Sequence, residues 1–298
     1  MNYEELLGEV CRHNTYENCL SLYINPFSLY YLCDHYYGDE LVVERMPAAV
    51  GRHKHDLLKS GDLTKIKFGD IVHCQVNYFE KFCREILDKI DQKFILTTGQ
   101  HDLPKIFKSE WTEKALNHRN IVLWFAQNPI YDNSEKYVAF PYGMKPSNLQ
   151  YYSNCLREDQ NPAKSRDLVC LPVNITNDCR KKLLNQPNLL PWDFFKKMSE
   201  AKFILSPIGD RDDCFRHYEA IGLGTIPVSN VHPFYKNIFT TNMIYATIDE
   251  MVEMIGGKNE SALPDSLIYR EPNRDLICYQ YHKNITMKLI AERLAKQQ

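Results

Sequence analysis

The chain has 298 residues, which exceeds the usual size of one hydrophobic core and predicts two domains. Its net charge of -2 at pH 7 gives no general electrostatic reason to bind nucleic acid or an anionic membrane. No apolar run reaches the ~18 residues that a membrane span needs, and the acidic, amphipathic N-terminus does not have the pattern of a signal peptide.

The first half of the chain alternates short apolar runs with stretches of helical spacing. Strands are predicted at 70–76, 93–99, 120–128 and 136–144. Helices are predicted at 78–90 and 109–117, the second with Ser109 as its N-cap. Strands that alternate with helices are typical of an α/β fold with a parallel sheet.

A polar stretch with two prolines, 145–166, predicts a linker between the domains that could include a short helix. The alternation then restarts, with strands at 167–174, 202–206 and 225–230. Helices are predicted at 179–186, 191–201, 213–224 and 248–257, and one long helix at 273–298. We therefore expect an N-terminal domain at 1–150, a second domain at 165–272, and a C-terminal helix at 273–298.

The segment SPIGDRDDCFRHYEAIGLGTIPVSN (206–230) places a loop between a strand and a helix N-terminus. Unpaired N–H groups at such a terminus favour an anion, and Gly209 would let the backbone approach a phosphate closely. Arg216 and Glu219 share one helix face. A guanidinium there can bind a diphosphate, and a carboxylate one turn further on can accept hydrogen bonds from a ribose.

A purely structural interpretation of this segment is also open. Asp212 or Asp213 would then only cap the helix. Arg216 and Glu219 would form a surface ion pair worth roughly 0.3 kcal/mol.

The same segment resembles the nucleotide-sugar motif of exostosin-like glycosyltransferases, family forty-seven. The matching residues are Ser206-Pro207, Gly209, Asp213-Cys214, Arg216, Glu219-Ala220, Gly224 and Ile226-Pro227-Val228. The resemblance implies the GT-B fold, with two Rossmann-like domains facing a cleft and the C-terminal helix crossing back to the first. It also implies metal-independent, inverting transfer from a UDP-sugar to a glycan or glycoprotein hydroxyl, with UDP-xylose favoured.

The resemblance also implies roles for individual residues. The diphosphate would contact Arg216, with help from Arg211, and the ribose would contact Glu219. The remaining donor-binding residues would be Ser206, Pro207, Gly209 and Asp213. No cofactor is expected. Many eukaryotic members of that family are anchored in the Golgi membrane, whereas this sequence shows no anchor, so we expect a soluble, cytoplasmic protein of bacterial or viral origin. The scattered cysteines favour reduced thiols.

An inverting transferase also needs a general base, which we expect at the end of the strand 93–99. Asp102 is the first choice and His101 the second, although Asp102 would otherwise cap a turn before Pro104. His73, inside an apolar strand, is predicted to be a core histidine. Further residues that could face the cleft are Asp34, His35, Asn128 and Pro141–Gly143.

Two other functions stay open. Asp210 and Asp212 match the DxD pattern of metal-dependent transferases. The chain could also bind a nucleotide or a sugar without catalysis, because a fold does not fix a function.

Overall fold

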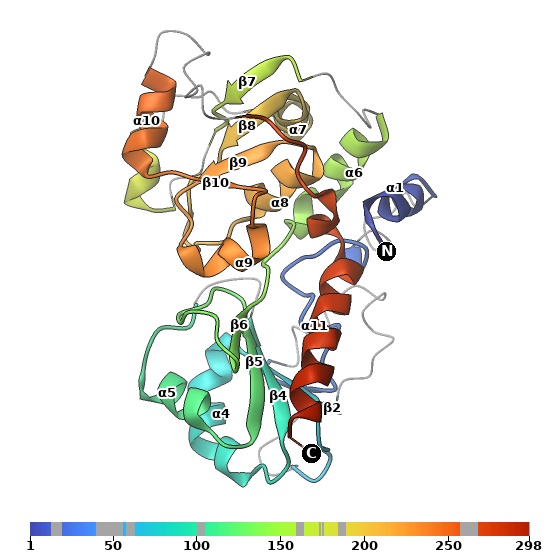
Figure 1. Ribbon diagram of the computed structural model, residues 1–298, viewed down its shortest axis with the longest axis vertical. Helices are drawn as coiled ribbons and strands as arrows, with labels where there is room; N and C mark the ends of the chain where they lie inside the picture. The colour runs from blue at the N-terminus through green and yellow to red at the C-terminus, as the bar shows by residue number, and fades with distance from the viewer. Residues whose placement is uncertain are drawn as a thin grey trace. The chain divides into compact units, whose positions relative to one another are not determined.

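The computed structural model describes residues 1–12, 20–39, 56–57, 63–99, 105–158, 164–172, 174, 176–183, 189–256 and 268–297 (Figure 1). The chain divides into two units. Unit 1 comprises residues 1–24 and 142–281, and unit 2 comprises residues 25–141 and 282–298. The expected boundary at residue 150 therefore differs from the observed one, and residues 1–24 belong with the second sheet.

Unit 2 contains a parallel sheet with the strand order β2-β1-β3-β4-β5-β6. The strands are β1 (His35–Tyr37), β2 (Asp56–Leu57), β3 (Ile71–Gln75), β4 (Phe94–Gly99), β5 (Ile121–Ala126) and β6 (Tyr137–Ala139). The helices are α4 (Phe79–Glu85) and α5 (Glu110–Asn117), with 3₁₀ turns η1 (Val76–Tyr78) and η2 (Leu87–Lys89). Mixed α/β architecture with parallel strands is thus confirmed for this half of the chain.

The core of unit 2 lies between the sheet and the helices α4 and α5. Alternate residues of β3, β4 and β5 point to this side, among them Leu96 and Trp124. Trp124 is fully buried, stacks on Phe79 at 5.4 Å between ring centroids, and donates from Nε1 to Thr98 Oγ1 at 2.8 Å. Ser109 caps α5 as predicted, since its Oγ accepts the Thr112 N–H.

Unit 1 contains a four-stranded parallel sheet with the order β10-β9-β8-β7. Its strands are β7 (Arg166–Val169), β8 (Ala201–Leu205), β9 (Ile226–Ser229) and β10 (Ile244–Tyr245). Its helices are α1 (Tyr3–Arg12), α6 (Leu149–Glu158), α7 (Pro191–Ser199), α8 (Phe215–Gly222), α9 (Lys236–Phe239) and α10 (Ile248–Gly256). Its 3₁₀ turns are η3 (Pro146–Asn148), η4 (Asp178–Leu183), η5 (Pro233–Tyr235) and η6 (Arg274–Ile277).

The segment predicted as a linker contains the short helix considered for it, but this helix belongs to unit 1. Residues 149–158 form α6, which buries Leu149, Tyr152 and Leu156 and packs against α1 and α7. These three residues share one helix face, so the segment contributes to the core of unit 1.

The C-terminal helix was predicted to begin at residue 273, but in the structure it begins later. Asn273 caps the 3₁₀ turn η6, Cys278 is extended, and α11 then runs from Tyr279 to Ala295. The break is stabilised by backbone pairing with residues near the N-terminus: the Ile24 N–H donates to the Ile277 carbonyl at 2.8 Å, and the Tyr279 N–H to the Leu22 carbonyl at 2.9 Å.

Candidate functional site

The segment that connects β8 to α8 follows the carboxyl end of β8. The Ser206 N–H extends the sheet by donating to the Val228 carbonyl at 2.8 Å. The helix α8 ends in a Schellman motif, in which Gly224 adopts φ 69°. There the Thr225 N–H donates to the Ala220 carbonyl at 2.9 Å, and the Gly224 N–H to Ile221 at 3.0 Å. The carboxyl end of β8 and the C-terminus of α8 are therefore fixed by backbone hydrogen bonds to defined partners.

The helix α8 begins at Phe215 with Cys214 as N-cap, so neither Asp212 nor Asp213 has the capping role considered from the sequence. Asp213 is fully buried instead. Its Oδ2 accepts from the Tyr142 N–H at 2.8 Å and the Tyr218 hydroxyl at 2.6 Å, and its Oδ1 lies 3.3 Å from His217 Nδ1. Asp213 thus joins α8 to the segment that precedes α6.

His217 is the centre of a buried charged network. Its Nε2 lies 3.1 Å from the Ser206 carbonyl and 3.0 Å from Ser229 Oγ. Burial lowers the pKa of His217, but Cys214 and Asp213 outweigh it and raise that pKa to about 10. For Cys214, burial raises the thiol pKa, while His217 and the nearby arginines lower it below its ordinary value overall. We therefore expect His217 to be protonated at neutral pH, beside a thiol of lowered pKa at the start of α8.

A pocket of about 320 Å³ lies within unit 1 at the start of α8. Its lining combines cations, one carboxylate, amides and apolar side chains. The lining residues are Lys145, Asn148, Pro172, Asn174, Arg180, Leu189, Pro191, Phe194, Phe195, Cys214, Phe215, Arg216 and Glu219. Two of the residues predicted from the sequence, Arg216 and Glu219, therefore line the same pocket.

The Arg216 guanidinium bonds to backbone carbonyls on the pocket wall. Nη1 reaches the carbonyls of Leu171 at 3.5 Å and Leu205 at 3.4 Å, and Nη2 donates to that of Pro172. The guanidinium also lies over the Phe194 ring, with Cζ 5.2 Å from the centroid. Burial lowers the pKa of Arg216, which nevertheless carries its charge at neutral pH.

Glu219 is only 4% exposed, so the interpretation of an exposed surface ion pair is wrong for this residue. Its Oε1 accepts from Asn148 Nδ2 at 3.4 Å, which is long for a hydrogen bond. The pKa of Glu219 is raised overall, because burial outweighs the opposing effects of Arg216 and Asn148. A buried carboxylate with one weak donor has capacity to accept hydrogen bonds from a ligand.

The loop before α8 is stabilised by residues that were not among the predicted site residues. Arg180, from η4, donates to the carbonyls of Ile208 at 2.8 Å and Pro207 at 2.9 Å. A Cβ on Gly209 would lie 2.9 Å from Arg180 Nη2 and 3.1 Å from Thr176 Oγ1, so a side chain there would have to displace the Arg180 guanidinium. The available signal was topological: β7 pairs with β8, which brings the segment after β7 to the loop after β8.

Five other predicted donor-binding residues lie outside the pocket lining: Ser206, Pro207, Gly209, Arg211 and Asp213. Ser206 is fully buried, with Oγ 3.7 Å from Cys214 Sγ. Arg211 is 4% exposed and lies over the Tyr142 ring at 4.8 Å. Pro207 is buried within the loop and contributes its carbonyl to Arg180. These residues shape the loop around the pocket rather than its surface.

In unit 2, the predicted general bases Asp102 and His101 lie outside the described residues. His73 is fully buried and bonds to Thr97 Oγ1 at 2.9 Å, which confirms it as a core histidine. Asp34 and His35 lie at the amino end of β1, where His35 Nε2 is 2.7 Å from Asp70 Oδ2. They are therefore at the sheet edge opposite to the carboxyl ends, where ligands of parallel sheets bind.

Asn128 follows the carboxyl end of β5 with a left-handed backbone at φ 56°, and it is 7% exposed. Among the described residues, its Oδ1 has no hydrogen-bond partner. Gly143 also has a positive φ, 86°, in the turn predicted at 141–143.

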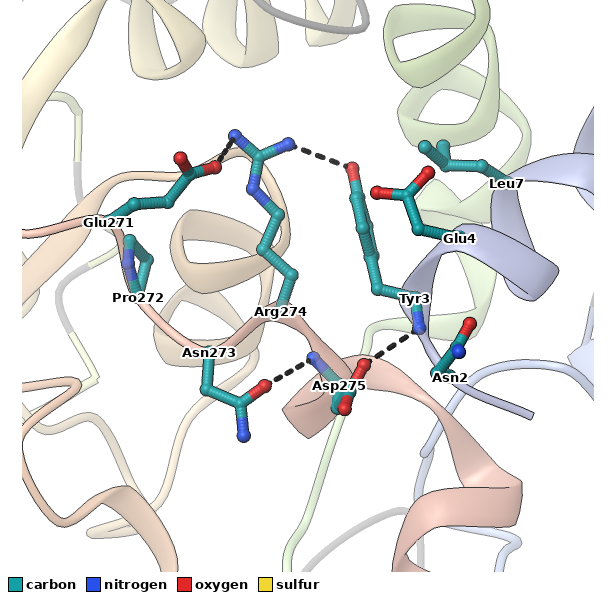
Figure 2. Close-up of a pocket in the computed structure, with 9 residues that line it drawn as sticks. All are labelled: Asn2, Tyr3, Glu4, Leu7, Glu271, Pro272, Asn273, Arg274 and Asp275. Carbon is teal, nitrogen blue, oxygen red and sulfur yellow. Dashed lines mark hydrogen bonds and ion pairs between the residues drawn. The ribbon is translucent and has the colours of Figure 1, made fainter.

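A second pocket in unit 1 differs from the first in its electrostatics. Figure 2 shows its lining, in which Arg274 points between Glu271 and Tyr3. Arg274 Nη2 pairs with Glu271 Oε1 at 2.6 Å, and Nη1 donates to the Tyr3 hydroxyl at 3.1 Å. The Tyr3 N–H in turn donates to Asp275 at 2.7 Å. Because this cation is already paired, the pocket has less need of an anionic ligand.

The comparisons with known proteins add no relative. No protein-family model matches the chain, and a search of the curated proteins finds no match either. The case for a function therefore depends on the residues themselves.

Two observations concern the other functional classes. No described helix combines the length and apolar character that a membrane span requires. Within the described ranges, no three His, Cys, Asp or Glu side chains gather as a metal site, and Asp210 is exposed while Asp212 is half-buried.

Proposed function

We propose that the protein is a metal-independent, inverting glycosyltransferase of the GT-B class that uses a UDP-sugar. One observation carries the proposal: Arg216 and Glu219, one helical turn apart on α8, line a single pocket at the carboxyl end of β8. The resemblance of 206–230 to the exostosin-like nucleotide-sugar motif supports the same assignment.

The pocket chemistry suits a nucleoside diphosphate. Its volume of about 320 Å³ lies at the lower end of the ~300–1,000 Å³ range of ligand pockets. The phosphates would lie at Arg216 and the N-terminus of α8, and the ribose hydroxyls would donate to Glu219. Phe194 and Phe195 offer apolar surface beside them.

In the proposed reaction the acceptor hydroxyl oxygen attacks the anomeric carbon while the bond from that carbon to the diphosphate breaks. Negative charge grows on the leaving diphosphate, and Arg216 and the α8 N-terminus stabilise it. A general base takes the hydroxyl proton, and Asp102 or His101 stays the prediction for that role. UDP-xylose stays the favoured donor, and a glycan or glycoprotein the expected acceptor.

The test is calorimetry of the intact protein with UDP, UDP-xylose and other UDP-sugars, with and without EDTA, followed by an assay of sugar transfer. Binding and transfer that ignore EDTA are expected. Activity lost with EDTA and restored by manganese would instead support a metal site at Asp210 and Asp212. Binding without transfer would support a non-catalytic protein, and the absence of UDP binding would overturn the proposal.

Two variants test the assigned roles. Glu219→Ala should weaken UDP binding about 10-fold or more, since hydrogen bonds to a charged group are lost. Arg216→Ala should lower kcat about 100-fold and affect binding less, because the diphosphate charge grows in the transition state. Arg166→Ala, at an exposed position at the start of β7, is the control for charge and should change neither.

A further inference from the structure

The pocket contains two guanidinium groups that bond to backbone carbonyls instead of carboxylates. Arg180 donates to the carbonyls of Ile208, Pro207 and Asn174 at 2.8, 2.9 and 3.0 Å. Arg216 donates to the carbonyls of Leu171, Leu205 and Pro172. Among the residues that the structure describes, neither arginine forms an ion pair with a carboxylate, whereas Arg274 of the second pocket does.

The two charges are close enough to oppose each other. Burial lowers the pKa of Arg216, and so does the charge of Arg180. Each guanidinium has five N–H donors in a planar fork. The three bonds of Arg180 to carbonyls leave donors available for a ligand. Two like charges on one pocket wall with donors to spare favour an anion with oxygens on several sides.

Arg180 also shapes the loop that follows β8. Its Nη2 occupies the space that a Cβ on Gly209 would need. The neighbouring Asn177 donates from Nδ2 to the Ile208 carbonyl at 3.0 Å and also to that of Gly209. Arg180 is therefore preorganised by the backbone that it contacts, and ligand binding would cost little side-chain entropy.

The residues follow an order along the pocket. Glu219 and Arg216 lie one turn apart on α8, and Arg180 contacts the carbonyls of Pro207 and Ile208 in the loop that precedes this helix. Arg216 is electrostatically coupled to both of the others. A ligand with its ribose at Glu219 would therefore place its first phosphate near Arg216 and its second near Arg180.

We propose that Arg180 contacts the distal phosphate of a bound nucleoside diphosphate, so that Arg180 and Arg216 together select a diphosphate over a monophosphate. This inference rests on the proposed function. It adds a contact from η4 that the motif in 206–230 does not contain.

The experiment is calorimetry of the full chain with UDP, UMP and uridine. The wild type should prefer UDP to UMP. Arg180→Gln should weaken UDP binding about 10- to 100-fold and UMP binding less than about 3-fold, because only the distal phosphate loses its partner. Lys181→Gln is the matched control, since Lys181 is an exposed neighbour paired with Asp178, and its UDP-to-UMP ratio should equal that of the wild type.

The outcomes separate the two proposals. A wild type that does not bind UDP overturns the proposed function. A wild type that prefers UDP, with an unchanged preference in Arg180→Gln, overturns the role of Arg180 alone. Inorganic pyrophosphate bound as tightly as UDP would show that the site takes a free diphosphate and would overturn the assignment to a nucleotide.

A second variant guards against a folding defect. Arg180→Lys keeps the charge but loses the fork, and thermal melting of both variants reports the effect on the loop. If Arg180→Gln melts early, the Lys variant decides: a UDP-to-UMP preference reduced at least about 3-fold supports the bidentate contact. A preference equal to the wild type in a stably folded Lys variant contradicts it.

Discussion

Substitution of Asp213 by Asn gives a sharp test of the buried network under the pocket. Asp213 Oδ2 accepts from the Tyr142 N–H and the Tyr218 hydroxyl, while Oδ1 faces His217 Nδ1. An Asn amide has only one oxygen, so if it keeps the first two donors its NH₂ group must face the protonated Nδ1. Two donors then meet in a fully buried site, and we expect a loss of about 3 kcal/mol in the free energy of unfolding.

The effect should depend on pH in a defined direction. The pKa of His217 is about 10 in the folded chain against an ordinary value of 6.5, so its protonation adds stability that is complete below pH 6.5 and is lost toward pH 10. Asp213→Asn removes one cause of the raised pKa. The difference between wild type and variant should therefore be largest below pH 6.5 and smaller near pH 10.

The assay is urea unfolding at these two pH values, combined with hydrogen exchange of peptides that cover 206–230. Hydrogen exchange is needed because two units need not unfold in a single transition. Asp212→Asn, at the half-buried neighbour, is the control and should stay within about 0.5 kcal/mol of the wild type. A comparably small effect of Asp213→Asn at both pH values would refute the reasoning.

Two further predictions concern the same helix. In Gly222→Ala the added Cβ would collide with Tyr152 Oη and with Ile277. This overpacking should lower the free energy of unfolding by about 2 kcal/mol and lower the melting temperature. An unchanged melting curve would contradict this. At neutral pH iodoacetamide should modify Cys214 before the half-buried Cys170, because the pKa of Cys214 is lowered while burial raises that of Cys170. Saturating UDP should slow the reaction of Cys214. Mass spectrometry of the labelled peptides measures both rates, and equal rates for Cys214 and Cys170 would contradict the prediction.

The sequence predicted the central strands because buried parallel strands are continuous apolar runs. Runs at 70–76, 93–99 and 120–128 correspond to β3, β4 and β5. Arg216 and Glu219 could also be predicted as neighbours, because the spacing of residues on a helix face follows from residue number alone.

What the sequence did not predict depends on contacts between distant segments. Asp213 resembles an N-cap, but Tyr142 and Tyr218 supply donors to its carboxylate and the cap passes to Cys214. The helix predicted from 273 yields to backbone pairing with residues 22–24. Nothing in the sequence separates Arg180 from the other basic residues of η4. Its position follows from the pairing of β7 with β8, which brings the segment after β7 to the loop after β8.

The discontinuity of unit 1 has a consequence for biosynthesis of the protein and for the choice of expression fragments. Unit 1 combines residues 1–24 with residues 142–281, which lie on either side of the 25–141 segment of unit 2, so a ribosome must synthesise the chain through residue 281 before unit 1 is complete. The Tyr3 hydroxyl donates to the Gly222 carbonyl at 3.1 Å, so the first helix supports the end of α8. An expression fragment that begins at residue 142 would carry every residue of the pocket and still lack this support. Attempts to isolate the pocket as a minimal domain should therefore retain residues 1–24, by circular permutation or by co-expression as a separate peptide.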